Sequence, residues 1–85
     1  MIDKSKFPNV TFYDNEGEGT RMRACNHMTK DHYLEVWEIV HDDPEKGDDK
    51  SSWRVVEFLQ HEEVAELDVS SFEAACHTAQ RGQSL

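Results

Sequence analysis

The sequence predicts an α+β fold: a small four-stranded antiparallel sheet (a β-meander) with one or two C-terminal helices packed on one face. The runs 33–40 and 53–59 are rich in β-branched and aromatic residues, which favour strands. Apolar residues then recur at helical spacing over 72–79, at Phe72, Ala75, Cys76 and Ala79. With 85 residues the chain is long enough for a single domain, residues 1–85, and too short for a second core.

The first half of the chain predicts a hairpin and a third strand. Residues 10–13 are β-branched and aromatic, and the Asp, Asn and Gly residues of 14–19 favour a turn. Residues 20–28 alternate loosely and predict a second strand paired with the first. Residues 33–41 fit both helical and strand spacing. The β-branched residues favour the strand, because they lose side-chain freedom in helices.

The second half predicts a hairpin and a helix. Residues 42–52 contain Pro and Gly and no apolar side chain, so they form the loop between the third and fourth strands. Residues 53–59 alternate as a strand. Residues 60–67 predict a short helical turn, since Val64 and Leu67 are three apart.

A capping box predicts where the last helix begins. Ser70 and Glu73 stand three apart, and their side chains would satisfy the first free N–H groups of a helix running to Arg81. Gly82 would end it.

The negative charge is unevenly distributed. Net charge is −9, and residues 31–73 hold fourteen of the eighteen acidic residues against three basic ones. Such a chain is repelled by nucleic acid and by anionic membranes, which predicts no direct binding to either. It is attracted to basic protein surfaces.

The sequence predicts a cytoplasmic protein. It has no signal-peptide pattern and no apolar run long enough to span a membrane. Cys25 and Cys76 are expected to be reduced thiols, with a disulfide between them as the alternative.

No metal or cofactor is predicted. Cys25, His27, His32, Cys76 and His77 lack the paired spacing of structural zinc sites. Neither of the two acidic loops fits the EF-hand pattern of calcium sites. A loop starting at residue 14 has no Glu at its twelfth position, and one starting at residue 42 has Pro and Lys at ligand positions.

The sequence predicts no enzyme. It contains no nucleophile elbow, phosphate loop or zincin helix. A domain of this size also has little volume for an enclosed pocket. A small metal-binding protein remains the less favoured alternative.

The acidic surface is therefore the candidate site. On strands, alternate residues lie ~6.6 Å apart, so carboxylates can stand in rows that resemble the phosphates of a nucleic-acid strand. Aromatic residues beside them would serve as anchors. The predicted partner-binding residues are Glu35, Glu38, Asp42, Asp43, Glu45, Asp48, Asp49, Glu57, Trp37 and Trp53.

In size, acidity and lack of a catalytic constellation, the chain resembles small phage-encoded inhibitors of host defence, such as anti-CRISPR and anti-restriction proteins. This resemblance is compositional and transfers no residue roles. It implies an inhibitor that occludes the basic surface of a nucleic-acid-handling protein, as a nucleic-acid mimic. The alternative is a regulatory or structural interaction domain whose acidity serves solubility only. An exposed edge strand would also allow a homodimer.

Overall fold

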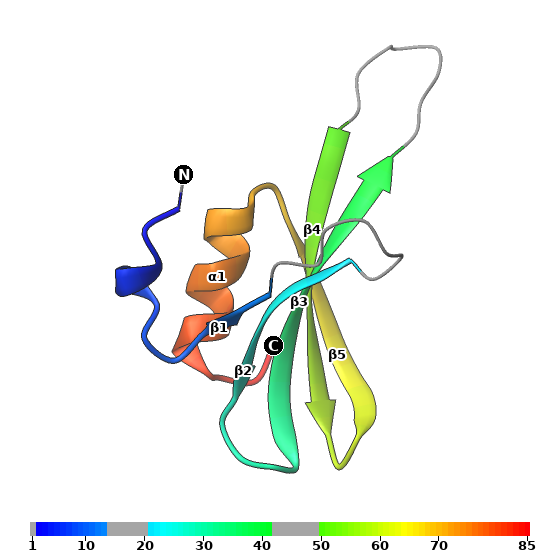
Figure 1. Ribbon diagram of the computed structural model, residues 1–85. Helices are drawn as coiled ribbons and strands as arrows, with labels where there is room; N and C mark the ends of the chain where they lie inside the picture. Colours follow the sequence, from blue (N-terminus) through cyan, green and yellow to red (C-terminus); the bar gives the residue numbers. More distant parts are fainter. Residues whose placement is uncertain (1, 14–20, 42–49) are drawn as a thin grey trace.

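The computed structural model describes residues 2–13, 21–41 and 50–85 (Figure 1). The described chain forms a five-stranded antiparallel sheet, a short 3-10 helix and one α-helix. The elements are η1 (Lys4–Lys6), β1 (Thr11–Phe12), β2 (Met22–His27), β3 (His32–His41), β4 (Lys50–Leu59), β5 (Glu62–Val69) and α1 (Phe72–Arg81).

The strands follow one another across the sheet in chain order, β1-β2-β3-β4-β5, each antiparallel to the next. The central pair, β3 and β4, is in register along ten residues, from His32 opposite Leu59 to His41 opposite Lys50. In Figure 1, α1 and the N-terminal segment lie on one side of this sheet, and no described element covers the other side. The α+β class, the antiparallel sheet and the C-terminal helix are confirmed.

The core lies between α1 and the sheet because β3 and β4 alternate strictly. Leu34, Val36 and Val55 point toward α1 and have no exposed surface. They meet the apolar stripe of the helix, which is buried at Ala75, Cys76 and Ala79. Burial of each large aliphatic side chain stabilises the fold by ~1.5–3 kcal/mol.

Both ends of α1 are fixed by capping groups. At the N-terminus the side chain of Ser71, one residue later than predicted, accepts a hydrogen bond from the backbone N–H of Ala74 at 3.1 Å. At the C-terminus Gly82 has φ +65°, a left-handed conformation that glycine adopts without steric cost, as predicted. The amide of Asn26 on β2 donates to the carbonyl of Ala79 at 2.7 Å, which ties the helix end to the sheet.

The prediction of four strands and of a helical turn over 60–67 is wrong. Residues 62–69 form the strand β5, which follows β4 after a two-residue turn at Gln60 and His61. Both turn residues have positive φ, 54° and 65°, as two-residue hairpin turns of type I′ require. The predicted turn over 14–19 and most of the predicted loop over 42–52 lie outside the described residues.

Candidate protein-binding face

The face of the sheet turned away from α1 is called the open face here. Its residues alternate with the buried ones, so Trp37 and Ile39 on β3 and Arg54, Val56 and Phe58 on β4 all project from it. Their side chains are half-buried except that of Val56, which is 7% exposed. A sheet of this kind needs a cover on one face only, and α1 supplies it.

Strand register arranges the open face into three cross-strand rows. One row crosses four strands through His27, Tyr33, Phe58 and Glu63. The next runs through Cys25, Glu35, Val56 and Glu66. The third runs through Met22, Trp37, Arg54 and Asp68. Each row therefore ends in a carboxylate on the edge strand β5.

A β-bulge in β5 brings these three carboxylates to one face. Phe58 pairs with Glu63 while its neighbour Glu57 pairs with Ala65, so Val64 is an extra residue without a partner on β4. Strict alternation would turn Glu63 and Glu66 to opposite faces, since they are three residues apart. Because the bulge adds one residue between them, Glu63 and Glu66 project from the same face. Val64 itself is 53% exposed.

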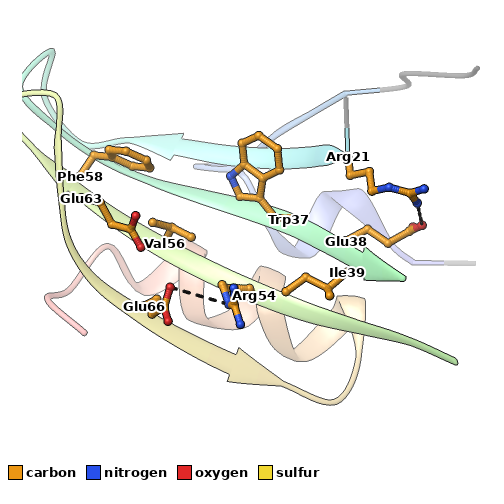
Figure 2. Close-up of a pocket in the computed structure, with 9 residues that line it drawn as sticks. All are labelled: Arg21, Trp37, Glu38, Ile39, Arg54, Val56, Phe58, Glu63 and Glu66. Carbon is orange, nitrogen blue, oxygen red and sulfur yellow. Dashed lines mark ion pairs between the residues drawn. The ribbon is translucent and has the colours of Figure 1, made fainter. Parts of the chain in front are cut away.

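A hollow of about 390 Å³ lies in the middle of the open face (Figure 2). Its floor is apolar, with Trp37, Ile39, Val56 and Phe58 projecting from β3 and β4. Charged side chains surround this floor: Arg54 between the apolar residues, Glu63 and Glu66 on β5, and Arg21 and Glu38 at the far end.

Aromatic rings form a stack beside the hollow. The rings of His27 and Tyr33 lie 4.7 Å apart with planes inclined by 16°, and those of Tyr33 and Phe58 lie 5.1 Å apart at 15°. Stacks of this geometry contribute beyond the area they bury. The hydroxyl of Tyr33 also lies 3.3 Å from Nδ1 of His61 in the β4–β5 turn. These contacts hold the aromatic side chains in place at the end of the open face next to the β4–β5 turn.

Ion pairs neutralise part of the charge. Nε of Arg54 donates to Asp68 at 2.7 Å and lies 3.9 Å from Glu66, and the contact with Asp68 raises the pKa of Arg54. Glu38 lies 3.7 Å from both Arg21 and Arg23. These pairs are partly exposed to solvent, so each is worth little to folding stability.

A polar contact links Tyr13, the residue after β1, to this face. The hydroxyl of Tyr13 lies 3.2 Å from Sγ of the buried Cys25, and this hydrogen bond, with burial, raises the pKa of Tyr13. The neighbouring Glu35 accepts a hydrogen bond from Nε1 of Trp37 at 3.0 Å. That bond holds the indole ring beside its own strand. The two cysteines are free and buried, Cys25 on the open face and Cys76 in α1.

The structure brings some of the predicted partner-binding residues together and separates others. Glu35 and Trp37 lie on the open face, and Glu38 lines one end of the hollow. Glu57 and Trp53 lie on the helix side, where Glu57 is buried and Trp53 contacts the ring of Phe72 at 4.7 Å. The remaining five, Asp42, Asp43, Glu45, Asp48 and Asp49, lie outside the described residues.

Sequence reasoning left out several residues of this face, among them Arg54, Val56, Phe58 and Asp68. The alternation of β4 contained the signal for the first three, since it sets them opposite Val55 and Glu57. Asp68 had no such signal, because its segment was not recognised as a strand.

Among residues 2–13, 21–41 and 50–85, no group of three or more His, Cys, Asp or Glu side chains is placed to hold a metal ion. Within the same residues, no helix is long and apolar enough to cross a membrane. Comparison with known proteins finds no match: no protein-family model, no curated protein and no solved structure is similar to this chain.

Proposed function

We propose that this protein is a small acidic binding domain that inhibits a partner protein by covering a basic surface on it. It acts by steric and electrostatic occlusion and performs no reaction. The observation that carries the proposal is the open face, where an apolar hollow is bordered on β5 by Glu63 and Glu66, the carboxylates that end two of the three rows. Exposed apolar surface with a polar border is typical of protein interaction sites.

The distribution of charge along the chain supports the same proposal. By sequence, residues 14–20 and 42–49 carry seven of the nine net negative charges. The strand ends that flank both segments lie at one end of the sheet, because β1–β2 and β3–β4 are alternate connections of a meander. This excess of negative charge favours a basic partner over an acidic one.

Trp37 is the proposed anchor for the partner. Its indole forms part of the apolar floor of the hollow, and large aromatic side chains dominate binding energy at such positions. We expect Trp37→Ala to weaken binding by at least ~2 kcal/mol, a typical cost for such an anchor. Trp53→Ala is the matched control, because Trp53 lies on the helix side.

The test is affinity purification from the native host, followed by titration of the captured protein by calorimetry. The proposal expects a basic partner whose binding weakens steeply with ionic strength. Trp37→Ala should weaken this binding by the amount given above, and Trp53→Ala should leave it unchanged. An acidic partner, or equal effects of the two tryptophan variants among molecules that remain folded, would overturn it.

Charge reversal separates this proposal from the rival in which acidity serves only solubility. Replacing Asp42, Asp43, Asp48 and Asp49 by Lys should abolish binding if the segment contributes to recognition. If the affinity for the partner is unchanged, the hypothesis that this segment takes part in recognition is wrong.

Imitation of nucleic acid is the more specific form of the proposal. It expects the partner to bind either this protein or its own nucleic acid, but not both at once. A competition titration with labelled nucleic acid measures this directly. If the partner binds this protein and nucleic acid at the same time, nucleic-acid mimicry is wrong, although the protein is still a binding domain.

A further inference from the structure

The outer edge of β5 is a strand edge with no strand paired to it among the described residues. β5 runs from Glu62 to Val69, and none of its side chains is fully buried. The backbone groups on such an edge can pair with another chain. From Ala65 to Val69 the register with β4 is uninterrupted. The outer edge of β5 beyond the bulge therefore has the regular backbone geometry with which another strand can pair.

The charge of β5 determines what can pair with it. Four of its eight residues are acidic and none is basic. A second copy paired through β5 would bring four carboxylates from each chain into one seam, and like charges on facing strands are destabilising. A strand that carries Lys or Arg would instead gain from opposite-charge pairs.

We propose that β5 binds an extended basic segment of the partner, which adds to the sheet as a sixth strand along Ala65–Val69. Its alternate Lys or Arg side chains face Glu66 and Asp68, and a further one reaches Glu63 across the bulge. Each cross-strand row of the open face is thereby extended by one basic residue. This inference rests on the proposed function and names the chemistry of the partner.

The geometry of the rows explains why basic residues are expected at alternate positions. Side chains on one face of a strand are two residues apart, and those directly opposite on the next strand lie ~4.5–5.5 Å away at Cβ. Glu66 and Asp68 are two residues apart on the open face, and their side chains are 52% and 63% exposed. An added strand in extended conformation would place its own alternate side chains beside them.

The probe is a synthetic peptide in which lysine and valine alternate. It is added to the isotope-labelled protein while amide hydrogen exchange is followed by NMR. The expected result is slower exchange of outward-facing β5 amides, with exchange elsewhere unchanged. A glutamate–valine peptide of equal length is the charge control and should cause no protection.

A second peptide separates strand addition from charge attraction alone. It has the lysine–valine sequence with alternate backbone nitrogens methylated, which keeps the charge and removes the N–H donors. The inference expects it to lose both binding and protection. Equal binding of the methylated peptide, or protection outside β5, would overturn strand addition while leaving a basic-surface binder in place.

Two variants with the same change in net charge complete the test. The double variant Glu63→Lys with Glu66→Lys should bind the lysine–valine peptide about tenfold more weakly, since opposite-charge pairs become like-charge pairs. Asp31→Lys with Glu73→Lys alters exposed residues outside β5 and should change affinity by less than about threefold. Equal losses in the two variants, no binding of the peptide at all, or a dimer that forms through β5 in sedimentation would each overturn the inference.

Discussion

Nε2 of His32 lies 2.6 Å from Oε2 of Glu57, on the helix side of the sheet. Glu57 is only 5% exposed, and its other carboxylate oxygen accepts a hydrogen bond from the backbone N–H of Leu85 at 3.2 Å. The contact with His32 lowers the pKa of Glu57 most, and hydrogen bonds from Leu85 and Ser84 lower it further, against the opposing effect of burial. Through this carboxylate, residues after α1 are tied to β3 and β4.

Stability should therefore fall at acid pH as Glu57 becomes protonated. Between its lowered pKa and the ordinary value of about 4.3, the unfolded chain binds a proton that the native state does not, so the free energy of unfolding rises with pH in this window. Glu57→Gln removes this contribution and should flatten the acid side of the profile. Urea unfolding at a series of pH values gives the slope of the free energy of unfolding against pH for the original protein and for Glu57→Gln. Identical slopes for the two proteins would contradict the prediction.

Cys76 should resist alkylation in the native protein. It has no exposed surface, and its burial among apolar residues, with the nearby charge of Glu73, raises the pKa of its thiol to about 11. Near pH 8 only about one such thiol in a thousand is ionised, and the thiolate is the reactive form. Mass spectrometry after iodoacetamide should find Cys76 unmodified until denaturant is added. Rapid modification of the native protein would show that α1 opens readily.

Leu34 should be the more costly of two matched leucines to truncate. It has no exposed surface and lies between α1 and the sheet, so Leu34→Ala should lower the free energy of unfolding by about 2–5 kcal/mol. Leu59 at the end of β4 is 47% exposed, and Leu59→Ala should cost less than about 1 kcal/mol. Chemical denaturation gives both values. If the two variants lose similar free energies of unfolding, Leu34 is not a core residue.

The β4–β5 turn should be open to stabilisation. Gln60 has φ 54°, a left-handed conformation that costs most residues about 1 kcal/mol and that Asn tolerates better. Its backbone N–H donates to the carbonyl of Asp31 at 2.6 Å, a bond that a substitution of the side chain preserves. Gln60→Asn should raise the free energy of unfolding by about 0.5 kcal/mol. Gln60→Ala keeps the unfavourable φ and should give no increase.

The strands that sequence reasoning found are those whose two faces differ most. β3 and β4 alternate between buried aliphatic and half-buried aromatic or charged side chains, and α1 has an apolar stripe at helical spacing. β5 was missed for two physical reasons. Its turn is Gln60-His61 rather than Asn-Gly, and the bulge at Val64 interrupts the alternation that marks a strand.

The candidate site could be predicted only in part, because alternation assigns residues to faces without saying which face is covered. The sequence pattern placed Glu57 with Trp53 and Val55, and in the structure that is the side packed against α1. Glu57 is buried there because His32 and the backbone of Leu85 supply partners for its charge. Such partners come from distant parts of the chain, so no local pattern reveals them.

The bulge at Val64 also bears on how this surface could arise or be lost. Deleting that one residue would place Glu63 two residues before Glu66, so a regular strand would keep both on the open face; a strand that kept Val64 but lost the bulge would turn Glu63 toward the helix side with the acidic composition of the segment unchanged. The face that Glu63 occupies is thus set by the bulge rather than by the number of acidic residues in the segment. Two related chains could share every acidic residue of this segment and still present different surfaces.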